Sequence, residues 1–160
     1  MFTLVEVVGV RIEMPSNQPI VLLKEREGRI FLPIWVGSVE ATSIAFAQQA
    51  LTPARPLTHD LIVDLLAATS TDLTAVHITE MRDGIFYAEL MLRNSTGELA
   101  PLSVRPSDAI AIALRTKTNI LVSQDLLESA GIQIPAGSQS EEEVEAFREF
   151  LDQINPEDFA

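Results

Sequence analysis

The 160-residue sequence contains no cysteine, which excludes disulfide bonds, thiolate metal sites and a cysteine nucleophile. It has no uninterrupted apolar run long enough to span a membrane, and its first six residues lack the basic start of a signal peptide. A glycine-rich nucleotide-binding loop and a Gly-x-Ser-x-Gly nucleophile elbow are also missing from the sequence. We therefore expect a soluble cytoplasmic protein without the classical nucleotide-binding and hydrolase motifs.

Positive charge is scarce. The chain carries 11 Lys and Arg residues against 23 Asp and Glu residues, a net charge of -12. Residues 138–160 hold eight of the acids and one base, so the tail contributes -7 and residues 1–137 contribute -5. Such a body does not bind phosphate backbones through its net charge, so nucleic-acid chemistry would need a local basic patch or bridging cations.

An internal duplication organises the sequence. The stretch VGSVEATSIAF (residues 36–46) lies over VRPSDAIAIAL (residues 104–114) at a constant offset, with Glu40 over Asp108. Each stretch follows strand-like sequence and precedes a second helix with Asp-Leu near its start. Alternating apolar segments and turn signals such as Asp83-Gly84 predict three strands before each stretch.

The predicted fold class is α+β. We expect two β-β-β-α-α repeats, at about 3–70 and 71–133, that form one barrel-like, mostly antiparallel sheet with flanking helices in a domain spanning 1–134. The helices are predicted at 39–50, from Thr58 onward, at 106–116 and at 124–130. Residues 135–160 read as an acidic linker and a C-terminal amphipathic helix. Because that helix has an apolar stripe to bury, we expect a homodimer or a higher homo-oligomer.

Acidic residues stand in the first turn of each predicted helix, notably Glu40, Asp60 and Asp108. One interpretation is structural, because an acid there interacts with the helix dipole and stabilises the helix by about 1 kcal/mol. The other is a metal site. If a pseudo-twofold axis relates the repeats, the helix starts converge, and these three carboxylates then offer the hard oxygen ligands that Mg²⁺ or Mn²⁺ prefers.

Basic and hydroxyl side chains lie beside these acids. His59 can act as a base or a ligand, whereas His77, in the middle of a predicted strand, is interpreted as a solvated residue. Arg55 and Arg105 each precede a proline, which favours an extended backbone there. They either hold a phosphate or pair with a nearby acid. The predicted substrate-binding set is Arg55, Thr58, Arg105 and Ser107, and the predicted catalytic set is His59, Asp60 and Asp108.

Several segments in order resemble the bifunctional nuclease domain family: LPIWVG (32–37), RPLTHDL (55–61), the hairpin DGIFYA (83–88) and RPSDA (105–109). The resemblance covers about residues 3–133, and the acidic tail is similar to that of actinobacterial members. It implies two β3α2 repeats that share one barrel-like sheet, and cleavage of both RNA and DNA. It implies no particular catalytic residues, so the sets above depend on motif positions and chemistry.

Two functions follow as hypotheses. The first is a divalent-metal-dependent phosphodiesterase acting on RNA and DNA, with His59 as general base or acid. The second is a non-catalytic oligomeric binding protein that uses the same cleft for a small ligand or a partner. Two observations discriminate between them: whether the three carboxylates lie within about 5 Å of a common point, as ligands of one cation would, and whether the two arginines face solvent or pair with the acids.

Overall fold

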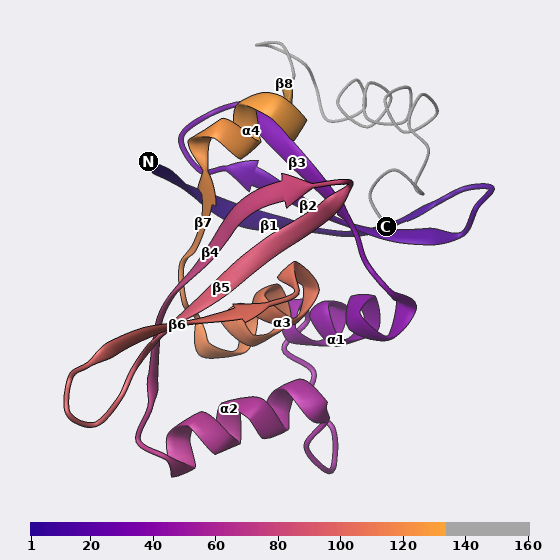
Figure 1. Cartoon of the computed structure of the whole chain (residues 1–160). Helices are drawn as coiled ribbons and strands as arrows, with labels where there is room; N and C mark the ends of the chain where they lie inside the picture. The colour runs from indigo at the N-terminus through magenta and orange to yellow at the C-terminus, as the bar shows by residue number, and fades with distance from the viewer. Residues whose placement is uncertain (134–160) are drawn as a thin grey trace.

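An eight-stranded mixed sheet and four helices make up residues 1–133, the part of the chain that the computed structural model describes (Figure 1). The linker and amphipathic helix predicted at 135–160 lie outside these residues. In chain order the elements are β1 (Phe2–Glu13), β2 (Gln18–Glu25), β3 (Ile30–Trp35), α1 (Ser38–Gln48), α2 (Thr58–Ala68), β4 (Asp72–Arg82), β5 (Ile85–Arg93), β6 (Leu99–Val104), α3 (Pro106–Thr116), β7 (Ile120–Ser123), α4 (Gln124–Ala130) and β8 (Ile132–Gln133).

The strands lie in the order β6-β5-β4-β7-β1-β2-β3-β8. Every neighbouring pair is antiparallel except β4 and β7, which are parallel, so the mostly antiparallel sheet is confirmed. The barrel-like closure is not. The sheet is open, with β6 and β8 as its edges, because β8 has two residues that pair only with β3 and nothing in the described chain joins it to β6.

Buried apolar side chains explain where α1 and α3 lie. The run from Ala109 to Ala113 in α3 is buried throughout, and Ala41 and Ile44 of α1 are buried with it in the same core as the sheet. The two helices lie side by side against the sheet, and α2 packs against α3 (Figure 1). Pro106 occupies the first turn of α3, where its missing N–H breaks no helical hydrogen bond, and the predicted bounds 106–116 are confirmed.

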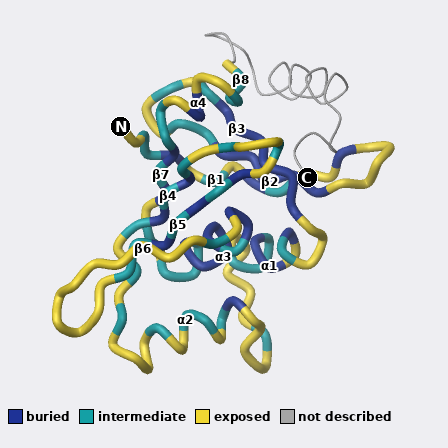
Figure 2. The backbone as a smooth tube through the Cα atoms, viewed as in Figure 1, coloured by how far each residue is buried: buried dark blue, intermediate teal, exposed yellow. Residues whose placement is uncertain are grey.

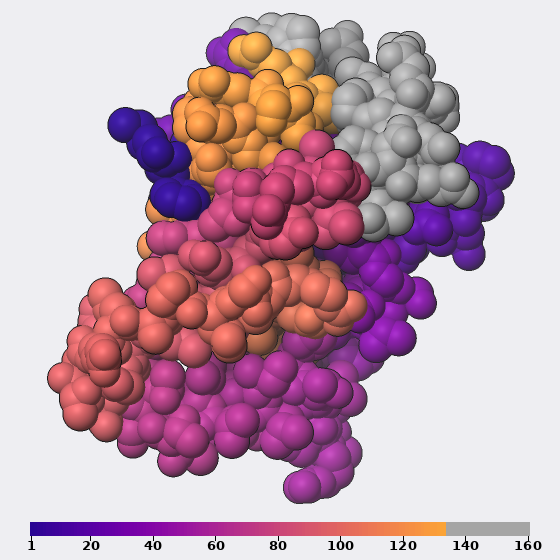
Figure 3. Space-filling view, in the orientation of Figure 1, coloured from indigo at the N-terminus to yellow at the C-terminus, as the bar shows by residue number. Residues whose placement is uncertain are grey.

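The helix α2 is far more exposed than its sequence suggests. Of its residues only His59 is buried, although most of the others are apolar (Figure 2). The outer face of α2 carries Leu61 and Leu65, which are 59% and 57% exposed, and Leu57 before the helix is 37% exposed. In the space-filling view α2 forms one end of the molecule (Figure 3).

The element order departs from two identical repeats in the second half. Strand β7 lies between α3 and α4, pairing with β1 on one side and with β4 on the other. It coincides with the short apolar segment Ile120–Val122, whereas β8 was not expected from the sequence. The duplication itself therefore stays a prediction. In the part of the chain described, no helix is long and apolar enough to cross a membrane.

Candidate functional site

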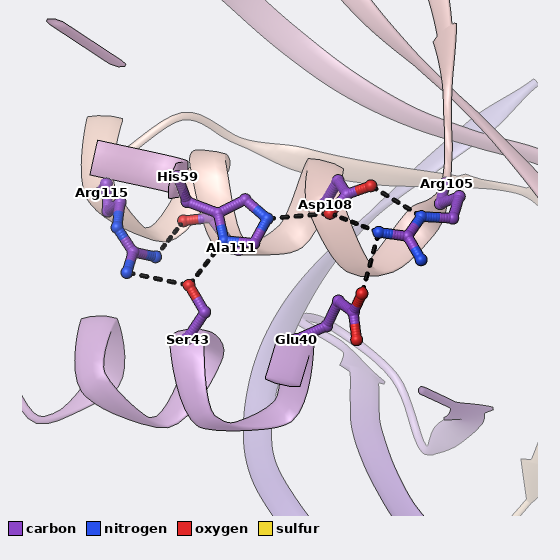
Figure 4. Close-up of polar contacts among 7 residues, drawn as sticks. All are labelled: Glu40, Ser43, His59, Arg105, Asp108, Ala111 and Arg115. Atoms are coloured by element: carbon purple, nitrogen blue, oxygen red, sulfur yellow. Dashed lines mark hydrogen bonds and ion pairs between the residues drawn. The ribbon is translucent and has the colours of Figure 1, made fainter. Parts of the chain in front are cut away.

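The first turns of α1, α2 and α3 meet, as the convergence hypothesis predicts, and their polar side chains form one network (Figure 4). Arg105, the residue before α3, has the extended backbone (φ -72°, ψ 143°) that the following proline favours. Its Nε donates to Asp108 Oδ2 at 2.8 Å, and its Nη2 donates to Asp108 Oδ1 at 3.1 Å and to Glu40 Oε1 at 2.9 Å. One guanidinium thus joins the starts of α1 and α3.

His59 lies behind this ion-pair cluster. Its Nε2 is 2.8 Å from Asp108 Oδ1, and its Nδ1 is 2.6 Å from the hydroxyl oxygen of Ser43 in α1. The His59 side chain is 8% exposed, whereas that of Arg105 is 64% exposed. The imidazole is therefore enclosed with both ring nitrogens engaged, and Arg105 is the most exposed of the ion-paired side chains of the network.

Arg115, near the end of α3, closes the network from the other side. Its Nη2 donates to Ser43 Oγ at 3.0 Å, its Nε to Asp60 Oδ1 at 2.7 Å, and its Nη1 to the carbonyl oxygen of Ala111 at 2.9 Å. The second oxygen of Asp60 accepts the backbone N–H of Leu57 at 2.9 Å. The polar contacts run without a break from Asp60 through Arg115, Ser43, His59, Asp108 and Arg105 to Glu40.

The arginines lower the pKa values of the two aspartates. Burial alone raises the pKa of Asp108, but hydrogen bonds from Arg105 and His59 outweigh burial and hold that pKa below its ordinary value. The hydrogen bond from Arg115, followed by that from the Leu57 N–H, lowers the pKa of Asp60. The carboxylates of Asp108 and Glu40 in turn raise the pKa of Arg105. Both aspartates are therefore ionised and paired at neutral pH.

Comparison with known proteins identifies the family. The model of the bifunctional nuclease domain matches residues 21–135. The chain belongs to the bifunctional nuclease domain family. An uncharacterized protein of Mycobacterium tuberculosis is 47% identical over 162 residues, which cover 97% of this chain and 96% of the mycobacterial protein.

Plant relatives are more distant. Bifunctional nuclease 1 of Arabidopsis thaliana is 28% identical over 122 residues, covering 74% of this chain and 38% of the plant protein. The bifunctional nuclease of Oryza minuta is 28% identical over 127 residues, covering 78% of this chain and 38% of the rice protein. The chain thus spans well under half the length of these plant proteins.

Three of the residues predicted for this family member's site lie outside the network. Arg55 and Thr58 are exposed, and their side chains make no polar contact with another residue between 1 and 133. Ser107 is buried in the first turn of α3, 7% exposed, and is not bonded to the network. The predicted residues that the fold brings together are Glu40, His59, Asp60, Arg105 and Asp108.

The carboxylates of the network are arranged around arginines. Glu40 Oε1 and Asp108 Oδ1 converge on Arg105 Nη2, while Asp60 lies with Arg115. Among the residues described, no group of three His, Asp or Glu side chains is placed to hold a metal ion. Each of the three acids is paired with a guanidinium in this arrangement, so a divalent cation would have to displace the arginines to bind them.

Two network residues, Ser43 and Arg115, were not singled out from the sequence. A signal for them exists in helical spacing. Ser43 lies three positions after Glu40 and Arg115 lies seven after Asp108, so each is on the same helix face as a predicted site residue. Each also lies beside buried apolar residues of its helix, Ser43 next to Ile44 and Arg115 just after the run 109–113. Polar residues so placed need partners, which the network supplies.

A pocket lies on the other side of Arg115. It has a volume of about 600 Å³, within the range of small-ligand sites. The loop after α1, one side of α2 and the end of α3 form its walls, and Asp60 and Arg115 contribute to both the pocket and the network. Its charged lining residues are Asp60, Asp64, Arg115 and Lys117.

Proposed function

We propose that the protein is a nuclease that hydrolyses phosphodiester bonds of RNA and DNA. Membership of the bifunctional nuclease domain family supports the activity, and one structural observation supports the place. The Arg105 side chain is 64% exposed while its guanidinium holds the carboxylates of Glu40 and Asp108, and Asp108 links it to the enclosed His59.

Arg105 binds the scissile phosphate in this proposal. A guanidinium presents paired N–H donors that match two phosphate oxygens, and it keeps its charge at all working pH values. Its Nη1 donates to no other residue in the part of the chain described, so a phosphate oxygen can bind there first. A second phosphate oxygen then competes with the carboxylates for the remaining donors.

Substrate binding at Arg105 changes Asp108. When the guanidinium turns to the phosphate, Asp108 loses a hydrogen bond that lowers its pKa, and it becomes a stronger base. Asp108 then accepts a proton from a water molecule whose oxygen attacks phosphorus. The bond from phosphorus to the leaving oxygen breaks, and that oxygen takes a proton back from Asp108. His59 orients Asp108 throughout, and Asp60 has no chemical role in this scheme.

The divalent cation, Mg²⁺ or Mn²⁺ bound by Glu40, Asp60 and Asp108, stays a prediction, and no step of this scheme depends on it. A cytoplasmic location also stays a prediction.

The test uses labelled single-stranded RNA and DNA with the full-length protein, with added Mg²⁺, with Mn²⁺ and with chelator. We compare wild type with Asp108→Asn, Arg105→Gln and the control Arg93→Gln, which alters an exposed arginine at the end of β5. We expect the two site variants to lose about 100-fold or more in rate while they stay folded in thermal melts. Equal cleavage by all four proteins contradicts the assignment of the site, and no cleavage by wild type contradicts the activity.

A non-catalytic oligomeric binding protein is the second candidate, and two observations favour it. The network leaves none of its buried polar side-chain atoms without a partner, and the 600 Å³ pocket beside it offers space for a small ligand. We propose in either case a homodimer or larger homo-oligomer, because Leu57, just before α2, and Leu61 and Leu65 of α2 are exposed and spaced four residues apart.

Light scattering after size exclusion tests the assembly. The double variant Leu61→Glu/Leu65→Glu is expected to run as a monomer, whereas Ile85→Glu, which changes a 47% exposed residue at the start of β5, keeps the wild-type mass. If wild type associates and the α2 variant keeps the same mass, the interface lies on another surface. A monomeric wild type contradicts the proposed assembly.

A further inference from the structure

We infer that Ser43 and Arg115 are positioning residues, which together fix the ring proton of His59 on Nε2 and so keep Asp108 in place as an acceptor beneath Arg105. The consequence for catalysis rests on the proposed function. The position of the ring proton is independent of that function, because it follows from which atoms can donate hydrogen bonds and which can accept them.

The argument begins at Arg115, whose guanidinium can only donate. Its Nη2 lies 3.0 Å from Ser43 Oγ, so the serine oxygen accepts there. Ser43 has one hydroxyl proton, and its other polar neighbour is His59 Nδ1 at 2.6 Å. In the described chain no other acceptor lies within hydrogen-bonding distance of this hydroxyl. Ser43 therefore donates to Nδ1, which must be free of a proton.

The contact of His59 Nε2 leads to the same tautomer. Asp108 is ionised, so its Oδ1 can only accept, and it lies 2.8 Å from His59 Nε2. Nε2 must carry the proton. All three hydrogen bonds then run in one direction, from Arg115 through Ser43 and His59 to Asp108. The His59 side chain is 8% exposed, so water has little access to disturb that order.

Arg115 keeps this direction because it is itself held. Asp60 accepts from its Nε and the Ala111 carbonyl accepts from its Nη1, and its side chain is only 10% exposed. Two acceptors, one from α2 and one from α3, thus hold the guanidinium so that Nη2 is directed at Ser43. Without the Arg115 donor, the Ser43 hydroxyl could rotate and accept a hydrogen bond from the ring instead. Arg115 is therefore needed to keep the ring proton on Nε2.

The functional consequence concerns the orientation of the Asp108 carboxylate. A donor on Nε2 binds Oδ1, which also accepts from Arg105 Nη2, while Oδ2 accepts from Arg105 Nε, the orientation in which Asp108 faces the proposed phosphate site. A ring with its proton on Nδ1 would place a lone pair against the carboxylate and push it away. Ser43 and Arg115 thus act on the reaction through His59, without touching the substrate.

Nitrogen NMR of the histidine side chains tests the inference without any turnover. Ring ¹⁵N shifts report which nitrogen carries the proton, at a pH where the ring is neutral, and His77 serves as a second histidine that should not change. We expect the wild-type His59 ring to carry its proton on Nε2 alone. A proton on Nδ1 overturns the inference.

The contribution of Ser43 is separated from that of Asp108 by removing the acid. In Asp108→Ala the proton should stay on Nε2, because Ser43 still donates to Nδ1. In Asp108→Ala/Ser43→Ala and in Asp108→Ala/Arg115→Met the two ring shifts should move toward each other as the second tautomer appears. The matched control is Asp108→Ala/Thr42→Ala, which removes the neighbouring exposed hydroxyl and should behave as Asp108→Ala. A mixture of tautomers already in Asp108→Ala overturns the inference.

Kinetics then link the device to the nuclease. Ser43→Ala should lower kcat by about 10- to 100-fold, the usual effect of removing the partner of a functional histidine, and should change KM little because Ser43 does not touch Arg105. A wild-type protein that cleaves nothing but gives the expected NMR spectrum contradicts the proposed function alone. Full kcat in a folded Ser43→Ala variant overturns the functional half of this inference.

Discussion

At the scale of the residue, Arg105 joins two parts of the chain that are distant in sequence. Glu40 and Asp108, which occupy the same position in the two overlaid stretches, both accept from its Nη2. Because the Arg105 side chain is 64% exposed, these ion pairs are solvated and contribute little to stability. The arrangement is better suited to presenting a guanidinium at the surface than to holding the fold together.

Replacing Arg105 by lysine separates these two roles. Lysine keeps the charge but loses the planar fork of donors, so Arg105→Lys should weaken phosphate binding and raise KM for RNA about tenfold or more. Its melting temperature should stay within a few degrees of wild type, because an exposed pair contributes about 0–1 kcal/mol. Steady-state kinetics and calorimetry measure the two effects, with Arg93→Lys as the control. A large fall in melting temperature with unchanged KM would show that the residue is structural.

The lowered pKa values of Asp60 and Asp108 make the free energy of unfolding depend on pH in the acidic range. Each folded-state pKa lies below the unfolded one, so the stabilisation is complete above the ordinary aspartate value, near pH 4, and is lost as the pH falls through the folded-state value. Denaturant unfolding between pH 2 and pH 6 (about the window these shifts define) should show this loss in wild type. Asp60→Asn and Asp108→Asn should be less stable at pH 6 and lose less on acidification. An equal slope in all three proteins would contradict the assigned shifts.

At the scale of the element, α2 is attached to the body by few buried groups. His59 is its only buried residue, and Arg115 of α3 holds its first turn through Asp60. By contrast, α3 has a buried residue at most of its positions. Elements with few buried contacts open at low free energy, so α2 should be the least protected of the described helices.

Hydrogen exchange of wild type and Arg115→Met tests that attachment. Removing the guanidinium takes away the hydrogen bonds that Arg115 donates to Asp60 and Ser43, which should lower the free energy of opening of α2 by roughly 1–3 kcal/mol. Its amides should exchange about tenfold faster or more, while those of α3 keep their protection relative to global unfolding. Arg82→Met is the control, since its ion pair with Glu80 is exposed. Uniform acceleration across all helices would mean that Arg115 stabilises the whole fold and not this element.

The elements that sequence reasoning found are those whose signals are local. Pro106, Asp108 and the apolar run after them define α3, and the alternating segments give the six long strands. What it missed depends on tertiary contacts. Closure of the sheet depends on whether β6 and β8 meet, and β8 exists only because two residues reach β3. Ser43 and Arg115 enter the site only when α1 and α3 lie together, which no single-helix pattern contains.

At the scale of the whole molecule, the site has one more carboxylate than guanidinium and lies within an acidic chain. Its three carboxylates face two guanidiniums, and the sequence from 1 to 137 has a net charge of -5. The net charge of such a protein repels a nucleic acid at long range. In the proposed function, binding therefore depends on the donors at Arg105.

The salt dependence of binding measures how many phosphates are held. Each neutralised phosphate of single-stranded nucleic acid contributes about -0.7 to the slope of log K against log salt, so we expect a slope near -0.7, far from the values of basic DNA-binding proteins. Fluorescence anisotropy with a labelled oligonucleotide and the Asp108→Asn variant gives the slope without cleavage. The double variant Asp108→Asn/Arg105→Gln should lose this salt dependence of binding. A steep slope that survives in Arg105→Gln would place the binding surface elsewhere.

Strand β7 has a consequence for how the chain is made. Residues 120–123 separate β1 from β4 in the sheet, so the strand that joins the two halves is among the last of the described residues to leave the ribosome. Until then β1 has an open edge, and until α3 has emerged shortly before, the face of α1 that packs on α3 has no cover. The nascent chain therefore carries an incomplete sheet through most of its synthesis, and folding can finish only after Ser123 has emerged.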